Sequence, residues 1–354
     1  MENPAKHIHI GRHTLGPGHP AFIVAEMSGN HGGSLEYALE IVHAAKRSGA
    51  DAIKLQTYTA DTITLKSDRQ DFRIPSGTPW AGHSTLWSLY NKAYTPWDWH
   101  ESIFREARSL DLEIFSSPFD ESAVELLEQL GASAYKIASP EITHIPLLDK
   151  VARTGKPVIL STGIAALEDI ELALATLREA GSGDIILLKC TTAYPAPVEE
   201  ANLRTISDMI SRFGVLAGLS DHTTGAISSI VAISMGASFI EKHFTIDKAK
   251  ETVDSFFSAD ESEFASLVKD IRLAEKAMGE VSYEIARSAL SSLNSRRSVY
   301  VAEAIKAGEF ITDSNIKTVR PAFGLHPRFY KEIIGRQAKC DMQAGDRLQL
   351  EMLQ

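Results

Sequence analysis

The sequence has 354 residues, of which 44% are hydrophobic and 23% charged, as in ordinary globular proteins with a sizeable core. Its net charge of −10 argues against general attraction to nucleic acid or to an anionic membrane. The N-terminus lacks the apolar stretch of a signal peptide, and no run approaches the ~20 apolar residues of a membrane span. Because Cys190 and Cys340 show no metal or disulfide spacing, they fit a reducing compartment, and we expect a cytoplasmic protein.

Short apolar runs rich in β-branched residues recur through the first three quarters of the chain and predict eight strands. Amphipathic segments separate them, and such an alternation is typical of a parallel sheet covered by helices. The predicted strands are Phe22–Met27, Ala52–Thr57, Glu113–Pro118, Ala134–Ser139, Pro157–Thr162, Ile185–Cys190, Val215–His222 and Phe239–Phe244.

The segments between these strands have helical periodicity and recognisable ends. The first begins after an N-cap at Ser34 and ends at Gly49, and ESAVELLEQLG ends at Gly131. Further helices are predicted at Trp97–Leu110, His144–Thr154, Ala166–Ala180, Leu203–Phe213, Ala226–Met235 and Glu261–Met278.

Eight strand-helix units in about 250 residues predict a closed (β/α)8 barrel, a TIM barrel of the α/β class. An open, doubly wound sheet is the alternative, but no Gly-x-Gly-x-x-Gly follows the first strand. Nearly every strand ends in polar or ionisable residues, as a catalytic mouth at the carboxyl ends of barrel strands requires. The alternative is that strand ends are simply more exposed to solvent than strand centres. That would explain one or two polar residues, but not polar residues at nearly every strand end.

Two segments break the rhythm of the barrel. From about Tyr283 the chain has short alternating strands and two similar turns, Lys306-Ala307-Gly308-Glu309 and Gln343-Ala344-Gly345-Asp346, which indicate a compact strand-rich domain with a weak internal repeat. We expect a barrel domain at 1–280, a serine-rich linker at 281–294 and a small C-terminal domain at 295–354. A long insertion, Asp61 to Pro96, is of a length that is usually functional or partly disordered.

Two histidines end neighbouring strands of the predicted barrel. His222 ends the seventh strand and His243 the eighth, so both imidazoles come within reach of one cation. Two imidazoles with water and substrate oxygens suit a loosely held divalent metal acting as a Lewis acid. Histidines buried in a core are the alternative, but the matched positions and the neighbouring carboxylates favour a metal site.

Two lysines lie inside apolar strands. Lys54 and Lys136 would be costly to bury without an anion, so we expect them to point into the barrel and bind a phosphate or carboxylate. An internal ion pair with Glu26 or Glu141 is the alternative. Hydroxyl groups that could add donors around the same anion belong to Ser117, Ser139, Ser161 and Ser220.

Acidic residues in or just after the strands could orient a sugar, handle protons or support the histidines. Glu26 interrupts an otherwise apolar strand, which makes a purely solvated role unexpected. Gln56 and Tyr194 are candidate sugar contacts, with buried structural roles as the alternative. The other acidic candidates are Asp221, Glu241 and Asp254.

The motifs AEMSGNHGGS, IKLQT, FSSPFD, AYKIASPE, ILSTG, KCTTAYPAP, GLSDHT and EKHF together resemble the sialic acid synthase family in order and almost end to end. The tail with VRPAFG resembles the antifreeze-like C-terminal (SAF, β-clip) domain of that family. Within the family, AEMSGNH, KCTTAYPAP and AYTPWDWH are most similar to the pseudaminic acid branch.

This resemblance implies a transferase that condenses phosphoenolpyruvate with 2,4-diacetamido-2,4,6-trideoxy-L-altrose, releasing phosphate, for a surface glycan such as that of flagellin. It implies a divalent ion, Mn²⁺ or Mg²⁺, on His222 and His243, and a domain-swapped homodimer in which Arg320 reaches the partner's site. Glu26 matches a carboxylate near the reacting carbons. Positions that hold phosphoenolpyruvate match Lys54, Ser117, Lys136, Ser139, Ser161 and Ser220, and sugar-contacting positions match Gln56, Tyr194, Glu241, Asp254 and Arg320.

Some residues depart from the sialic acid synthase pattern. Thr192 stands in place of an asparagine, Ser117 replaces a threonine, and TIDKAKETVD lacks a Gly-Pro. These changes leave the reaction type intact, so a sister synthase making sialic (N-acetylneuraminic) or legionaminic acid is the alternative. A non-catalytic sugar-binding protein and a Schiff-base aldolase are more remote alternatives.

Overall fold

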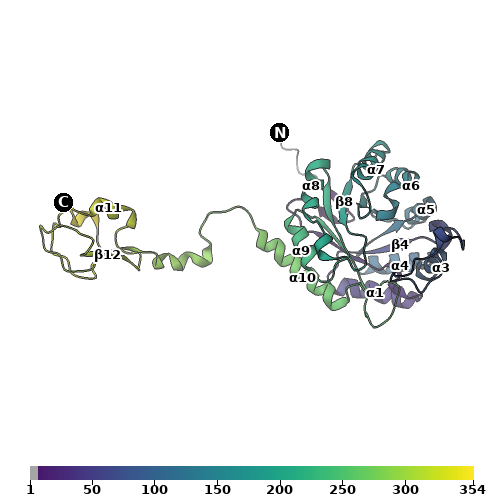
Figure 1. Cartoon of the computed structure of the whole chain (residues 1–354), viewed down its shortest axis with the longest axis horizontal. Helices are drawn as coiled ribbons and strands as arrows, with labels where there is room; N and C mark the ends of the chain where they lie inside the picture. The colour runs from purple at the N-terminus through teal and green to yellow at the C-terminus, as the bar shows by residue number, and fades with distance from the viewer. Residues whose placement is uncertain (1–6) are drawn as a thin grey trace. The chain divides into compact units, whose positions relative to one another are not determined.

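The computed structural model describes residues 7–354, and the chain divides into two compact units between Gly279 and Glu280 (Figure 1). The first unit is a closed barrel of parallel strands, and each neighbouring pair follows the chain order until β10 closes on β3. All eight predicted strands are confirmed. They are β3 (Phe22–Glu26), β4 (Ala52–Thr57), β5 (Glu113–Pro118), β6 (Tyr135–Ile137), β7 (Val158–Ser161), β8 (Ile185–Cys190), β9 (Leu216–Asp221) and β10 (Phe239–His243).

Helices surround the barrel and bury one face against its outer surface (Figure 1). The predicted N-cap is confirmed, because the Ser34 side chain accepts a hydrogen bond from the backbone N–H of Tyr37. Asp260 caps the last helix in the same way and forms a capping box with Glu263. The helices are α1 (Leu35–Arg47), α4 (Trp97–Ser109), α5 (Glu121–Gln129), α6 (Ile145–Ala152), α7 (Leu167–Glu179), α8 (Arg204–Phe213), α9 (Ile227–Ser234) and α10 (Glu261–Met278).

A hairpin that the sequence analysis did not predict joins the barrel interior. Its strands, β1 (Ile8–Ile10) and β2 (His13–Leu15), pair antiparallel. Ile8, Ile10 and Leu15 are fully buried in one cluster with residues from the starts of the barrel strands, including Phe22 and Phe239. The amino-terminal end of the barrel is therefore filled with apolar side chains, and the polar side chains lie at the other end.

Short elements follow several strands at the carboxyl end of the barrel. The insertion (residues 61–96) is ordered around two helices and a 3₁₀ turn, and single 3₁₀ turns follow β3, β6 and β8. The insertion elements are α2 (Ala60–Ile63), η2 (Gln70–Phe72) and α3 (Leu86–Ala93), and the other turns are η1 (Ser28–His31), η3 (Ser139–Thr143) and η4 (Val198–Glu200).

The second unit is small and irregular, with its own apolar core. The weak repeat in the sequence has a structural counterpart, because Ile305 and Met342, which directly precede the two turns, exchange backbone hydrogen bonds of 2.8–2.9 Å. Both turns place glycine at a positive φ, 87° at Gly308 and 94° at Gly345. The elements are β11 (Ser298–Val301), β12 (Ile316–Val319), η5 (Arg287–Ser295), η6 (Pro327–Phe329), α11 (Tyr330–Ile333) and η7 (Leu350–Met352).

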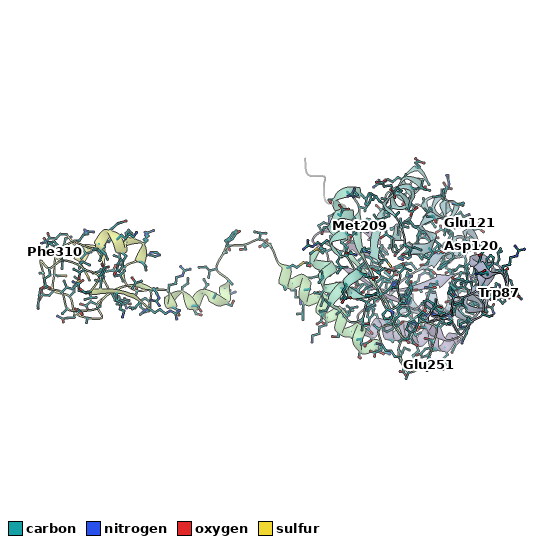
Figure 2. All side chains as sticks on the ribbon, in the orientation of Figure 1. Trp87, Asp120, Glu121, Met209, Glu251 and Phe310 are labelled. Atoms are coloured by element: carbon teal, nitrogen blue, oxygen red, sulfur yellow. The ribbon has the colours of Figure 1, made fainter. Side chains whose placement is uncertain are left out.

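The predicted linker, 281–294, is not simply extended, because η5 occupies its second half. Phe310 lies on the surface of this second unit (Figure 2). None of the helices in the described part of the chain combines the length and the apolar character that a bilayer crossing requires.

Candidate active site at the barrel mouth

Four charged side chains meet inside the barrel near the carboxyl ends of its strands. Glu26 shares the inward face of β3 with Phe22, because side chains on a strand alternate between two faces. The Nζ atom of Lys54 lies 2.6 Å from Oε2 of Glu26 and 3.7 Å from Oε1 of Glu241, and Nζ of Lys136 lies 3.7 Å from the same Glu241 oxygen. All four residues are at most 4% exposed.

Burial and mutual charge together set the protonation of this cluster. Burial raises the pKa of Glu26, although Lys54 opposes the shift. Burial also disfavours charge on Lys54, but Glu241 and Glu26 outweigh it and raise the pKa of the lysine. The pKa of Lys136 is lowered by burial, which Glu241 partly offsets. The two carboxylates thus act as internal counter-ions, a role that an incoming anion could take over.

The internal ion pair that the sequence analysis gave as the alternative is present for Lys54, and for Lys136 it is present with a different carboxylate. Glu26 is the partner of Lys54, but the carboxylate beside Lys136 is Glu241 rather than Glu141. Glu141 follows β6 in the turn η3, where its Oε2 atom is buried without a hydrogen bond. Burial raises the pKa of Glu141 to about 7, with Lys136 as a weak opposing charge.

The four predicted serines line the same inward-facing region, and each is at most 5% exposed. Ser117 accepts a hydrogen bond of 3.2 Å from Lys54, and Ser220 donates one of 3.3 Å to Glu241. The Ser139 hydroxyl accepts one of 3.0 Å from the backbone N–H of Gly163. Ser161 Oγ is buried without a partner, so it is a hydroxyl free for a ligand.

Gln56 connects the charged cluster to the loop after β10. Its Nε2 atom donates to Oε1 of Glu26 at 2.9 Å and to the Ser28 hydroxyl at 3.1 Å. The Ser28 hydroxyl in turn donates to Oδ2 of Asp254 at 2.5 Å, and Asp254 is buried. Gln56, Glu26 and Asp254 are thus brought together as the sequence predicted, whereas the role of Ser28 as the link was missed.

The two predicted histidines face each other across the mouth. Their ring centroids lie 5.3 Å apart, and Tyr194 packs against His222 at 4.5 Å. Phe257, from the loop after β10, packs against the His243 ring at 4.6 Å. Burial, reinforced by His222, lowers the pKa of His243 well below its ordinary value, so the ring is neutral.

These two imidazoles fit a divalent ion with open coordination positions. His243 Nδ1 is buried without a hydrogen-bond partner, and His222 Nδ1 lies 2.9 Å from the carbonyl oxygen of Thr191, which orients the His222 ring. Over residues 7–354, no three His, Cys, Asp or Glu side chains gather as a ligand set. Water and substrate oxygens would therefore have to complete the coordination.

Cys190 is an inward-facing residue of the mouth to which the sequence analysis gave no site role. Its Sγ atom lies 3.8 Å from His222 Nδ1. Burial raises its pKa, but His222 and Lys136 outweigh that effect and bring the pKa down to about 7. The alternation of β8, in which Ile186 and Leu188 face the interior, would have placed Cys190 on the same face.

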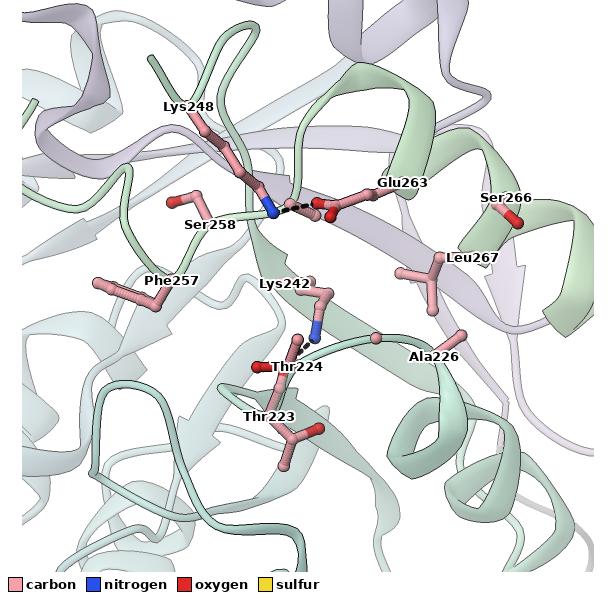
Figure 3. A pocket seen from close by; sticks show the side chains of 12 residues that line it. Thr223, Thr224, Ala226, Lys242, Lys248, Phe257, Ser258, Glu263, Ser266 and Leu267 are labelled. Atoms are coloured by element: carbon pink, nitrogen blue, oxygen red, sulfur yellow. Dashed lines mark hydrogen bonds and ion pairs between the residues drawn. The ribbon is translucent and has the colours of Figure 1, made fainter. Parts of the chain in front are cut away.

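Asp221 does not belong to this site, which corrects the sequence-based expectation. It points outward from β9, and its Oδ2 atom accepts hydrogen bonds from Lys242 at 3.0 Å and from Ser229 at 2.8 Å. Lys242 also donates to the carbonyl oxygen of Thr223, beside a hollow of about 220 Å³ between the start of α9 and α10 (Figure 3). Since this ion pair is buried and complete, Asp221 has a structural role.

A cavity of about 370 Å³ opens at the mouth, above the charged cluster. It is bounded by Gln56, Tyr194, His243 and Asp254 on the barrel side and by residues of the insertion on the other. Concave sites of this size with a few convergent polar groups are typical of small-molecule binding. Arg320, the remaining predicted site residue, lies exposed after β12 in the second unit.

The closed barrel, the buried charged cluster and the paired histidines define a barrel enzyme of the sugar-acid synthase class. The chain belongs to the NeuB family, which it matches over residues 41–283, and it matches the SAF domain over residues 296–354. This confirms the resemblance found in the sequence.

Relatives and solved structures agree with that assignment. The chain is 47% identical to a pseudaminic acid synthase from Helicobacter pylori, with 93% of this chain and 96% of the relative covered. It is 44% identical to a pseudaminic acid synthase from Campylobacter jejuni, with 92% of this chain and 95% of the relative covered. The crystal structure of an N-acetylneuraminic acid synthetase from Leptospira borgpetersenii is similar, with a TM-score of 0.72 and 30% identity. The match covers 82% of this chain and 95% of that structure.

Proposed function

We propose that this protein condenses phosphoenolpyruvate with 2,4-diacetamido-2,4,6-trideoxy-L-altrose to give pseudaminic acid and phosphate. The observation that carries this proposal is the meeting of two buried lysines, two carboxylates and two histidines at one barrel mouth. The choice of acceptor rests on the 44–47% identity to relatives that carry the name pseudaminic acid synthase.

Phosphoenolpyruvate would bind at the deep end of the site. Lys54 and Lys136 supply positive charge in a region of low dielectric, where their attraction for an anion is strong. Ser161 has a free hydroxyl that could donate a hydrogen bond to the bound anion. The Ser139 hydroxyl, which the backbone N–H of Gly163 holds in place, could donate another. Ser117 and Ser220 already touch the charged cluster and complete the set.

In the proposed reaction, the enol carbon forms the new bond to the aldehyde carbon, and the aldehyde oxygen takes up a proton. Water then adds to the carbon that bears the phosphate, and phosphate leaves as its bond to that carbon breaks. A divalent ion, Mn²⁺ or Mg²⁺, when bound at His222 and His243, supplies a Lewis acid for the aldehyde oxygen. Glu26 would stabilise the positive charge that develops before water adds, because it is buried and held in place by Gln56.

The sugar would occupy the cavity above the deep end. Gln56, Tyr194 and Asp254 line it and offer an amide, a phenol and a carboxylate for hydroxyl and acetamido groups. Glu241 lies deeper, between the two lysines, so its suggested sugar contact would be made at the reacting end. Holding both reactants in one enclosed mouth supplies the proximity contribution to catalysis.

We also propose a domain-swapped homodimer in which Arg320 completes the partner's sugar site. Charge supports this arrangement. Residues 280–354 carry 11 basic and 9 acidic side chains, while residues 1–279 carry 25 basic and 37 acidic side chains. The second unit is thus slightly positive and the barrel unit strongly negative, which favours binding of the second unit to the partner's barrel in the proposed dimer.

Mixed dimers test this arrangement. Arg320→Ala and Glu26→Gln variants should each be nearly inactive alone. After mixing with subunit exchange, about a quarter of wild-type activity should return, since half of the dimers would be mixed with one intact site each. No recovery in dimers shown to be mixed would contradict the swapped arrangement.

Phosphate release and product mass test the reaction itself. Purified protein would be incubated with phosphoenolpyruvate and each candidate acceptor: the diacetamido altrose, its legionaminic counterpart or N-acetylmannosamine. Turnover only with one of the latter two would replace the proposed acceptor, and no release with any sugar would favour a binding protein. Borohydride trapping with substrate would reveal the Schiff-base alternative. A cytoplasmic location and a surface-glycan destination such as flagellin remain part of the proposal.

A further inference from the structure

The cavity at the mouth has two walls of different chemistry. The barrel wall carries the polar side chains of Gln56, Tyr194, His243 and Asp254, together with the apolar side chains of Val253 and Phe257. The opposite wall comes from the insertion, and its contribution to the lining includes no charged or amide side chain. The apolar residues that the insertion contributes are Ile74, Pro75, Trp80, Leu86, Leu89 and Ala93.

The polar groups that the insertion does bring are largely engaged within the protein. The indole of Trp80 donates a hydrogen bond of 3.1 Å to the carbonyl oxygen of Val253, in the loop after β10. The hydroxyl of Thr78 donates one of 3.1 Å to the carbonyl oxygen of Pro75. Apart from the phenol of Tyr90, this wall therefore offers a ligand mainly carbon surface.

The insertion is also held in place, so its apolar surface is pre-formed. Thr85 starts α3 with a capping box to Ser88, and a β-bridge between Arg73 and Thr85 ties the segment carrying Ile74 to that helix. The Trp87 indole donates a hydrogen bond of 2.8 Å to Asp61, which anchors α3 to the start of the insertion.

Trp80 connects this wall to the loops of the barrel. Its ring packs edge-on against Tyr194, with centroids 5.6 Å apart, and against Phe256 at 6.3 Å. The apolar wall and the polar wall thus meet at an aromatic contact instead of being separated by a water-filled gap.

We propose that the insertion is the specificity wall of the acceptor site and receives the deoxygenated carbon and acetamido methyl groups of the sugar. This inference rests on the proposed function, which places the aldehyde oxygen near His222 and His243. The other end of the sugar chain then points away from the barrel, toward Ile74 and Leu86. A methyl group buries favourably there, whereas a hydroxyl group would lose its water without finding a partner.

Kinetics with a matched pair of sugars tests this wall. The pair is 2,4-diacetamido-2,4,6-trideoxy-L-altrose and its analogue with a hydroxyl group at C6. An apolar pocket discriminates by about 100-fold against an added hydroxyl, so wild-type kcat/KM should favour the deoxy sugar by about that factor. In the Ile74→Asn/Leu86→Asn variant, the preference should fall by about tenfold or more, while KM for phosphoenolpyruvate stays unchanged.

Two control variants separate a specificity effect from general damage. Ile74→Val keeps an apolar side chain and should keep the preference. Leu65→Asn changes a side chain in the same insertion that is 65% exposed and does not line the cavity, so it should behave as wild type. An unchanged sugar preference in Ile74→Asn/Leu86→Asn would overturn the proposal, as would an equal loss of kcat/KM on both sugars.

A binding measurement decides the question independently of turnover. In saturation-transfer NMR of the wild-type protein with the deoxy sugar, the C6 methyl and acetamido methyl protons should receive the strongest transfer, and Ile74→Asn/Leu86→Asn should weaken it. Equally strong transfer to the ring protons would contradict the proposal that the insertion binds the methyl groups. If the wild type binds this sugar through its methyl groups but releases no phosphate, the proposed reaction is wrong, whereas the proposed role of the insertion in sugar binding is supported.

Discussion

The Nζ atom of Lys54 lies 2.6 Å from Oε2 of Glu26, and both side chains are almost completely closed off from solvent. Such a pair is costly to break on one side, because the remaining charge stays buried without a counter-ion. In this site the arrangement also has a chemical consequence. In the proposed reaction, phosphoenolpyruvate would compete with Glu26 for the lysine, and the released carboxylate would then face the reacting carbons.

Removing one member of this pair should therefore damage both stability and activity. We expect Glu26→Gln to lower the free energy of unfolding by about 3 kcal/mol and kcat by at least about 100-fold. The double variant Glu26→Gln/Lys54→Met should recover much of the stability but none of the activity. Urea unfolding and phosphate release measure the two effects, and a double variant less stable than Glu26→Gln would contradict this account of the pair.

Replacing either histidine should abolish turnover while leaving the barrel folded. His243 Nδ1 has no hydrogen-bond partner to lose, so His243→Ala mainly removes a candidate metal ligand. We expect the metal affinity of the His222→Ala and His243→Ala variants to fall by more than about tenfold, as measured by calorimetry with Mn²⁺. Full activity of either variant after chelator treatment would exclude the proposed ion site.

Gly163 should tolerate no side chain. A Cβ atom there would lie 2.1 Å from Thr192 Oγ1, 2.9 Å from Ser139 Oγ and 3.0 Å from Cys190 Sγ. We expect Gly163→Ala to displace the hydroxyl of Ser139 and raise KM for phosphoenolpyruvate by about tenfold or more. Gly183→Ala is the matched control, because no atom lies within 4 Å of a Cβ at that position. An unchanged KM in Gly163→Ala would show that this side of the mouth is not used.

Glu141 should make the protein less stable as pH rises. Its pKa is about 7 in the folded state and 4.5 ordinarily, so between these values the folded protein keeps a proton that the unfolded chain releases. The free energy of unfolding should therefore fall from pH 4.5 to 7, by about 3 kcal/mol from this group alone.

The variant Glu141→Gln isolates that contribution. Lys136 and Tyr90 are the ionisable groups coupled to this carboxyl, and both remain in the variant. At pH 8, the free energy of unfolding of Glu141→Gln should exceed that of wild type. At pH 4.5, the variant should show no comparable increase. A difference between the two proteins that is the same at both pH values would show that Glu141 is not buried as a neutral acid.

Local patterns in the sequence predicted the barrel and its functional end. Continuous apolar runs identify strands that are buried on both faces, and this signal lies within each run. A lysine inside such a run, as at Lys54 or Lys136, has to face an anion wherever the strand packs. The polar ends of the strands meet because parallel strands in a closed barrel share one mouth.

Only the tertiary structure decided how those side chains pair. Glu241 rather than Glu141 meets Lys136, because Glu241 lies on the inward face of β10 whereas Glu141 lies beyond β6 in the turn η3. Asp221 turns outward to Lys242, because side chains alternate along a strand and its neighbour Ser220 takes the inward face. The packing of Trp80 against Tyr194 joins residues more than a hundred positions apart. The sequence by itself thus determined which residues had to be buried or had to find a charge, since those costs are local. Which partner each one met depended on how the chain closed on itself.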